Sequence, residues 1–471
     1  MENLKKVSPF RLSSLLRLEK DPNLALQLFR NPNPNPNPNP NPNPNPNPTQ
    51  KPFRYSLLSY DLIITKLGHG KMFDQMEQIL DQMKQETRFS PKEIIFCNVI
   101  TFYGRSRLSE LALRTFDRIP SFRCQRTVRS FNSLLNALLN CRELEKFREM
   151  YLDIDRYASP DACTYNILIN ACCSSSSLDN AWRLFDEMQS KGIQPNVVTF
   201  GTLISALCAN AKLDEAFRLK DDMMRKFHVN PNAFIYTSLI KGLCKINELD
   251  LAFKLKAEML DSKLKLDSAV YSTLISALFR AGKKGEVSNV LEEMSETGYK
   301  PDTVTYNAMI SGFCKENDFE SAFGVLNEMG KKGCKPDVIS YNIIIAGFCK
   351  EGRLREASDL LEDMPRRECS PDVVSYRTLF DGLCDRMEFK EAAFILDEMV
   401  FKKYVPRIAS VNKFVDGLCQ EGNMDLLLKV LNSLAKVNVI DVDTWKMAIT
   451  KVFKKAELSN TSELVDVLAM P

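Results

Sequence analysis

The stretch PDVISYNIIIAGFCKEG, residues 336–352, decides how this chain folds, because it is restated along the sequence. PDTVTYNAMISGFCKEN begins at Pro301 and PDVVSYRTLFDGLCDRM at Pro371, so the copies start 35 residues apart. A fixed period of this length is typical of repeat proteins, in which each repeat is one supersecondary unit that stacks on the next.

One repeat, residues 338–372, divides into two predicted helices. The first half, VISYNIIIAGFCK, is apolar and 13 residues long, a length that favours a buried helix over a strand. Asp337 precedes it as a candidate N-cap, and Gly352 ends it. The second half has one apolar stripe at spacings of three and four residues, which predicts an amphipathic helix. This stripe consists of Leu354, Ala357, Leu361 and Met364.

The same unit recurs along most of the chain. A single helix pair cannot bury its own apolar faces, whereas stacked pairs can. The sequence therefore predicts an all-α fold, an α-solenoid of helix–turn–helix repeats over residues 51–471, with a degenerate C-terminal cap after residue 441. The eleven repeats are 57–92, 93–127, 128–161, 162–196, 197–232, 233–267, 268–302, 303–337, 338–372, 373–407 and 408–441.

The N-terminal residues differ from the repeats. Residues 1–30 carry Lys and Arg, several Ser, and an apolar side in RLSSLLRL, a composition that resembles a mitochondrial transit peptide. A frayed N-terminal helix is the alternative. Residues 31–50 contain the tract (Asn-Pro)9, in which proline removes every second backbone donor, so we expect an extended polar linker.

Composition excludes several classes of protein. The net charge of +3 means that any nucleic-acid surface is local, and we find no apolar run of about 18 residues, so we expect no membrane span. Cysteines recur at one place in the repeat without the C-x-x-C spacing of zinc sites, which predicts small buried side chains and a reducing compartment. These cysteines are Cys208, Cys244, Cys314, Cys349, Cys384 and Cys419.

The repeat phrases VVTFGTLISALC, TVTYNAMISGFC and VISYNIIIAGFC, followed by LDEAFRL-like segments and G-x-x-PD, closely resemble the pentatricopeptide repeat family. The resemblance covers residues 57–471 and is most specific over residues 162–407. It implies a right-handed superhelix and the plain-repeat (P-type) subclass, because no H-x-E with C-x-x-C pattern follows the repeats. It also implies a plant organellar protein that binds single-stranded RNA.

The second residue of most repeats is apolar. The resemblance implies that it packs against the faces of RNA bases, and packing at the start of the helix is the alternative. These candidate base-stacking residues are Val198, Phe234, Ala269, Val304, Ile339 and Val374.

The thirteenth residue is basic in four successive repeats. This row predicts a local basic stripe that follows a phosphate backbone. The alternative is a set of solvated cations that a helix C-terminus favours. The candidate phosphate-binding residues are Lys245, Arg280, Lys315 and Lys350.

The fifth and the last residue of most repeats are polar, although they flank apolar stretches. The last residue also suits a helix N-cap, and both roles are compatible. The resemblance implies that the two residues together hydrogen-bond one base per repeat. These candidate base-reading residues are Asn132, Asp161, Asn166, Asn196, Asn232, Thr237, Asp267, Ser272, Asp302, Asn307, Asp337, Asn342, Asp372, Asn412 and Asp441.

The family's pairing rules imply a base for most repeats. Asn with Asp implies U, Asn166 with Asn196 implies C, and Thr or Ser with Asp implies G. Gly201 with Asn232 and Arg377 with Arg407 depart from the rules and give no base, as do the pairs of the first two repeats. Read 5′ to 3′ along residues 128–441, the predicted RNA is U-C-N-G-G-U-U-N-U.

The sequence favours a binding protein over an enzyme. We find no GxGxxG, GxxxxGK[ST], HExxH or GxSxG motif and only two histidines, so we expect no catalytic residues, no metal and no cofactor. A protein-binding helical-repeat scaffold without RNA recognition is the alternative. The resemblance implies that the protein is located in the mitochondrial matrix, with the chloroplast as the alternative. It also implies a role in organellar RNA processing, stabilisation or translation, with other organellar RNA-processing proteins as further partners.

Overall fold

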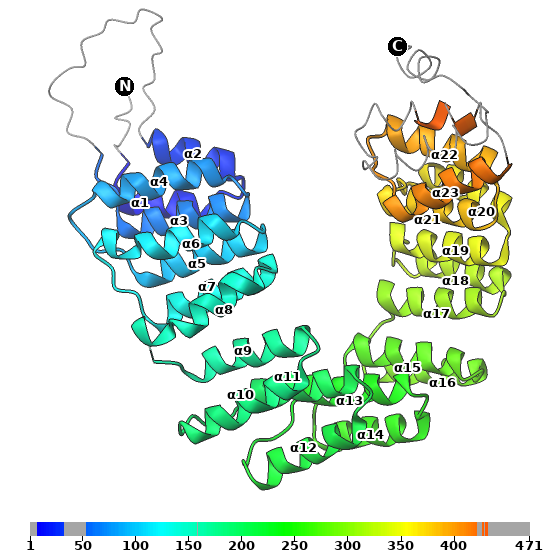
Figure 1. Ribbon diagram of the computed structural model, residues 1–471, viewed down its shortest axis with the longest axis horizontal. Coiled ribbons are helices and arrows are strands. Elements are labelled where there is room, and N and C mark those ends of the chain that lie inside the picture. Colours follow the sequence, from blue (N-terminus) through cyan, green and yellow to red (C-terminus); the bar gives the residue numbers. More distant parts are fainter. Residues whose placement is uncertain (1–6, 33–52, 158, 422–425, 428, 432–471) are drawn as a thin grey trace, which may run out of the picture. The chain divides into compact units, whose positions relative to one another are not determined.

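The computed structural model describes residues 7–32, 53–157, 159–421, 426–427 and 429–431. In this part of the chain it consists of α-helices and short 3-10 helices without any strand (Figure 1), which confirms the predicted all-α class. The chain divides into two compact units, Met1–Asn210 with Asp214–Pro231, and Ala211–Leu213 with Asn232–Pro471. Within the described residues, no helix is both long enough and apolar enough to span a bilayer.

A first helix begins at the first residue of each repeat that the sequence defines. Most of these starts follow an Asp, Asn or Thr whose side chain caps the helix, which explains why the helices start there. The first helices are α3 (Leu57–His69), α5 (Glu93–Arg105), α7 (Val128–Cys141), α9 (Ala162–Ser174), α11 (Val197–Ala209), α13 (Ala233–Lys245), α15 (Ser268–Arg280), α17 (Thr303–Lys315), α19 (Val338–Glu351), α21 (Val373–Asp385) and α23 (Ile408–Glu421).

A second helix follows a tight turn in the repeats. Gly352, which ends α19, has a φ of 78° in the left-handed region that glycine adopts without strain. The second helices are α4 (Phe73–Gln85), α6 (Ser109–Arg118), α8 (Leu144–Leu152), α10 (Leu178–Ser190), α12 (Leu213–Arg225), α14 (Leu249–Asp261), α16 (Val287–Glu296), α18 (Phe319–Lys331), α20 (Leu354–Asp363) and α22 (Phe389–Phe401). The 3-10 helices are η1 (Ile119–Phe122), η2 (Ile154–Arg156), η3 (Lys284–Glu286) and η4 (Met364–Arg367).

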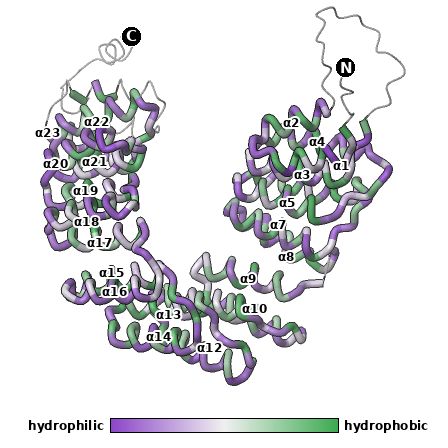
Figure 2. Tube along the Cα trace, turned by 180° about the vertical axis from the view of Figure 1, so that it is seen from behind, coloured by the Kyte–Doolittle hydropathy of each residue, from purple (hydrophilic) through white to green (hydrophobic). Residues whose placement is uncertain are grey.

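Helix pairs stack on their neighbours within each unit, as an α-solenoid requires. In the first unit α5 packs on α7 and α9 on α11, and in the second α15, α17, α19 and α21 pack in sequence. Hydrophobic and hydrophilic residues alternate along these helices (Figure 2). In one repeat the buried side chains come from both helices, so each pair shares its core with the next. They are Tyr341, Ile344, Ile345, Phe348, Ala357, Leu360 and Leu361.

The cysteines near the end of the first helices are buried, which confirms the sequence prediction for Cys208, Cys244, Cys314, Cys349 and Cys384. Burial raises the pKa of the Cys349 thiol to about 12, so it stays protonated at neutral pH. The side chain of Cys419 lies outside the described residues.

The N-terminal residues add a helix pair to the first unit. The helices α1 (Pro9–Leu18) and α2 (Pro22–Arg30) pack on α3. Leu12 and Phe29 are fully buried. The Phe29 ring stacks on Tyr55 with centroids 4.3 Å apart, and the Tyr55 hydroxyl donates to the Phe29 carbonyl at 2.8 Å. Residues 9–30 of the predicted targeting segment thus form two helices that pack one apolar side on α3, whereas residues 1–6 and 33–52 lie outside the described residues.

Candidate nucleic-acid interface

The last residue of each repeat from 128 to 372 caps the next first helix. Asp161 accepts from the Thr164 backbone N–H at 2.8 Å, and Asp372 accepts from the N–H groups of Val374 and Ser375 at 2.9 Å each. Capping satisfies N–H groups that have no partner inside the helix. The capping role considered for these residues is therefore confirmed for Asp161, Asn196, Asn232, Asp267, Asp302, Asp337 and Asp372.

Hydrogen bonds lower the pKa of three of these capping carboxyls, Asp161, Asp302 and Asp372. Burial alone would raise the pKa of Asp372, but bonds from Ser375, Asn342 and the Val374 backbone outweigh it, so its pKa lies below the usual value. Burial would also raise the pKa of Asp161, but hydrogen bonds from Thr164 and Asn132 outweigh it and lower that pKa below its usual value. The carboxylates therefore remain charged acceptors at neutral pH.

Three of the predicted base-reading pairs are in direct contact. The amide Nδ2 of Asn132 donates to Asp161 Oδ1 at 3.1 Å, and that of Asn166 to Asn196 Oδ1 at 3.2 Å. Asn342 Nδ2 lies 3.4 Å from Asp372 Oδ1. The fifth residue of one repeat and the cap of the next helix thus form one polar group, although about 30 residues separate them in sequence.

The hydroxyl residues at the fifth position bond to their own helix instead. Thr237 Oγ1 donates to the Ala233 carbonyl at 2.8 Å, and Ser272 Oγ to the Ala269 carbonyl at 3.2 Å. Asp302, the predicted partner of Ser272, contacts a different residue of the same repeat. It accepts a hydrogen bond at Oδ2 from the hydroxyl of Ser268, the first residue of that repeat, at 2.7 Å. Neither hydroxyl has a direct bond to its predicted partner among the described residues.

The remaining predicted pairs are placed in part. Asn307 lies on α17, with its Oδ1 buried and without a hydrogen-bond partner among the described residues. Asn412 is half-buried on α23, and Asp441 lies outside the described residues. Of the pair that gave no base, Arg377 Nε donates to the Val405 carbonyl at 2.7 Å and Arg407 pairs with Asp381 at 2.8 Å.

The apolar second residues lie at the surface. The exposed fraction of these residues runs from 44% at Val374 to 60% at Ile339, and Ala269 is half-buried. A branched or aromatic side chain exposed at the same place in successive repeats provides a flat apolar contact. Two residues that the sequence reasoning missed share this place, Leu58 at 43% and Ile94 at 49%. Counting the second residue in the two leading repeats would have found them.

The four basic residues are exposed at the C-terminal ends of the first helices. Arg280 Nη2 donates to the Cys244 carbonyl at 2.9 Å, so this side chain caps the end of α13. Lys315 and Lys350 make no ion pair with any described residue and remain available to an anion. The helix-end role and a phosphate role are both compatible with this placement.

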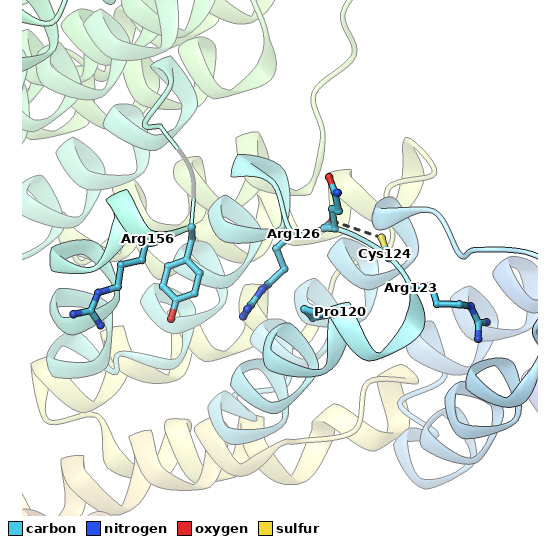
Figure 3. A pocket seen from close by; sticks show the side chains of 7 residues that line it. Pro120, Arg123, Cys124, Arg126 and Arg156 are labelled. Atoms are coloured by element: carbon cyan, nitrogen blue, oxygen red, sulfur yellow. Dashed lines mark hydrogen bonds between the residues drawn. The ribbon is translucent and has the colours of Figure 1, made fainter.

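A basic pocket in the first unit was not predicted from the sequence. A cavity of about 460 Å³ is lined by Pro120, Cys124, Gln125, Tyr157 and three arginines, Arg123, Arg126 and Arg156. In Figure 3 the side chains of Arg126 and Arg156 lie on one side of Pro120 and that of Arg123 on the other. Arg126 is held over the Phe116 ring at 5.0 Å and the Tyr157 ring at 5.2 Å. Arg156 lies 30 residues after Arg126 in sequence, which hid the cluster.

Models of the PPR repeat family match the chain at the period that the structure shows. The matched residues are 160–209, 195–245, 231–280, 266–315, 301–350 and 336–385. A PPR repeat model matches residues 374–404. Together the matches run without a gap over more than half of the 471 residues.

Relatives share the repeats over part of their length. A pentatricopeptide repeat-containing protein of Arabidopsis thaliana is 54% identical over 194 residues, which are 41% of this chain and 39% of that protein. The A. thaliana small ribosomal subunit protein mS79 is 33% identical over 144 residues, 30% of this chain and 36% of that protein. The chain therefore spans less than half of the length of these relatives.

Among solved structures, the maize protein PPR10 in complex with an 18-nucleotide psaJ RNA element aligns with a TM-score of 0.47 and 21% identity, over 92% of this chain and 65% of that chain. The family itself is assigned by the repeat models, whose six overlapping matches follow the period and each begin two residues before a first helix. The chain belongs to the pentatricopeptide repeat (PPR) family.

Proposed function

We propose that the repeats bind single-stranded RNA, with one nucleotide at each repeat. The observation that carries this proposal is the recurrence of three groups at fixed places in successive repeats. An exposed apolar residue such as Ile339 lies in the first turn of a first helix. Asn342 lies one turn on and contacts Asp372, the cap of the next first helix, and a cation such as Lys350 lies in the last turn. Apolar contact, hydrogen bonding and charge are what single-stranded RNA offers to a protein.

Each group has a part in binding. The second residues would pack on the base faces, a contact that tolerates any base. The fifth and last residues would choose the base through hydrogen bonds to its edge. The phosphates would be held by the cations at the ends of the first helices, Lys245, Lys315 and Lys350. Arg280 would join them if its guanidinium leaves the Cys244 carbonyl, which it contacts at 2.9 Å. In the second unit four successive complete pairs, from Thr237 to Asp372, would select G-G-U-U.

We propose binding as the activity of the repeats, with a role in organellar RNA processing, stabilisation or translation. Mitochondria are the proposed compartment, and the matrix is the proposed location within them. This is supported by relatives such as an A. thaliana pentatricopeptide repeat-containing protein named as mitochondrial, and by the basic composition of residues 1–30.

A change of one base-reading residue tests the proposal. Asn342→Thr, with Asp372 kept, recreates the Thr–Asp pair of repeat 233–267 and should shift the preferred base at that nucleotide from U to G. We would titrate fluorescent RNAs that differ only there and follow anisotropy. Asn327→Thr, at an exposed position on α18, is the control and should leave the preference unchanged. An unchanged preference in Asn342→Thr would refute base reading by the pair.

A further inference from the structure

A closed hydrogen-bond network surrounds the first base-reading pair. Asn132 Nδ2 donates to Asp161 Oδ1 at 3.1 Å, and the Thr164 hydroxyl lies 2.8 Å from Asn132 Oδ1. The Thr164 oxygen also accepts from the Asp161 backbone N–H at 3.2 Å. Both ends of the Asn132 amide are therefore held, and its orientation is fixed.

The next repeat builds the same network. Asn166 Nδ2 donates to Asn196 Oδ1 at 3.2 Å, and the Thr199 hydroxyl donates to Asn166 Oδ1 at 2.6 Å. Thr164 and Thr199 are each the third residue of the repeat that follows the reading residue. The hydroxyl that orients the amide thus comes from a position that plays no part in the two-residue pairing rule.

Two repeats of the second unit lack this contact. The Ser340 hydroxyl lies 2.9 Å from Asp337 Oδ1, and the Ser375 hydroxyl 3.0 Å from Asp372 Oδ1. The amide oxygens of Asn307 and Asn342 are buried and have no hydrogen-bond partner among the described residues. The bond from Asn342 to Asp372 is the longest of the three at 3.4 Å, and no bond joins Asn307 to Asp337.

A difference in rotamer freedom accounts for the contrast. The threonine hydroxyls also lie near the cap, since Thr164 Oγ1 is 2.9 Å from Asp161 Oδ1 and Thr199 Oγ1 is 3.3 Å from Asn196 Oδ1. The methyl group of threonine restricts its χ1 angle and holds the hydroxyl between the cap oxygen and the amide oxygen, whereas a serine hydroxyl turns to the cap alone. The amide oxygen then has no donor, and at Asn342 only the 3.4 Å bond to Asp372 opposes a rotation that would exchange the donor and acceptor ends of the amide.

From these contacts we infer that a threonine at the third place of a repeat is a positioning residue, which orients an asparagine at the fifth place of the preceding repeat and sets how strictly that preceding repeat selects its base. The inference rests on the proposed RNA binding. Asn132 with Asp161, Asn307 with Asp337 and Asn342 with Asp372 are matched pairs that should all read U. They differ in the third residue, so repeat 128–161 selects U more strictly than repeats 303–337 and 338–372.

The test exchanges one methyl group in each direction in the full chain. Ser340→Thr with Ser375→Thr should increase the preference for U over C at the two matching nucleotides by about three- to tenfold, the effect of one hydrogen bond. Thr164→Ser should lower the preference at its own nucleotide by a similar factor. Preference is the ratio of Kd values for RNAs that differ at one nucleotide.

Controls separate positioning from stability. Thr202, on α11, donates its hydroxyl to the Val198 carbonyl of its own helix at 2.9 Å, so Thr202→Ser should change no preference. A purely structural effect would change Kd equally for all RNAs, which would overturn the inference. The inference would also be overturned if the wild type binds RNA selectively but the serine and threonine variants have the same Kd ratios as the wild type. That result would leave the proposed function standing. A wild type without any base selectivity would refute both.

Discussion

At the scale of the residue, the cap at the end of each repeat combines two demands in one side chain. Asp161 and Asp372 must hold the start of a helix, and they must also leave a carboxylate oxygen in reach of the fifth residue. A carboxylate meets both, because its two oxygens accept several hydrogen bonds. This double role explains why Asp and Asn predominate at the place, and why sequence alone could not separate capping from base reading.

The lowered pKa values of these caps predict acid sensitivity. A carboxyl whose pKa is lower in the folded than in the unfolded chain stabilises the fold fully above the unfolded value, about 4, and less as pH falls through the folded value. Asp161, Asp302 and Asp372 all have lowered pKa values. We expect the free energy of unfolding to fall below about pH 4, and to fall less in Asp161→Asn/Asp302→Asn/Asp372→Asn, as measured by urea titration at pH 7 and pH 3. Equal losses in both proteins would contradict this account.

At the scale of the element, close approach of first helices depends on glycine. A Cβ on Gly382 of α21 would lie 2.6 Å from both Cβ and Sγ of Cys349 on α19. Gly382→Ala should therefore destabilise the second unit by about 1–3 kcal/mol through overpacking. Gly324→Ala on α18, where a Cβ meets nothing within 4 Å, should stabilise it by about 0.5–1 kcal/mol through helix propensity. Thermal unfolding measures both, and a change of the same sign in the two variants would refute this view of the packing.

The helices α1 and α2 behave as part of the array in the structure. Phe29 on α2 is 1% exposed and Phe10 on α1 is 81% exposed, so they form a matched pair. Phe29→Ala should cost about 3–5 kcal/mol locally and speed amide hydrogen exchange in α1, α2 and α3, whereas Phe10→Ala should not. Unaltered exchange in Phe29→Ala would mean that residues 9–30 do not stabilise the first repeat.

At the scale of the whole molecule, repetition explains what the sequence could predict. The eleven first helices start where the repeats start, because an apolar helix recurs at each place and a capping side chain precedes most of them. The packing of α1 and α2 was not foreseen, because the Asn-Pro tract interrupts the period before Leu57. The contacts of Thr164 and Arg280 were missed for another reason, since they depend on side-chain rotamers rather than on residue type.

Electrostatic attraction to RNA should show in the salt dependence of binding. Replacing Lys245, Arg280, Lys315 and Lys350 by Gln removes the exposed basic row of the second unit. Each phosphate contact contributes about 0.7 to the slope of log Kd against log salt for single strands. We expect the slope to fall by about 2 if Arg280 stays bound to the Cys244 carbonyl, and by about 3 if all four residues contact phosphate. An unchanged slope would mean that these residues face away from the RNA.

The most direct test of the central claim is a titration of the purified full-length chain against single-stranded RNA containing UCNGGUUNU and against a shuffled control, at two salt concentrations. The account predicts tight binding to the first RNA and weak binding to the second. Equal binding to both would contradict base selection by the polar pairs. Binding to neither would contradict RNA recognition itself and would favour a protein-binding scaffold.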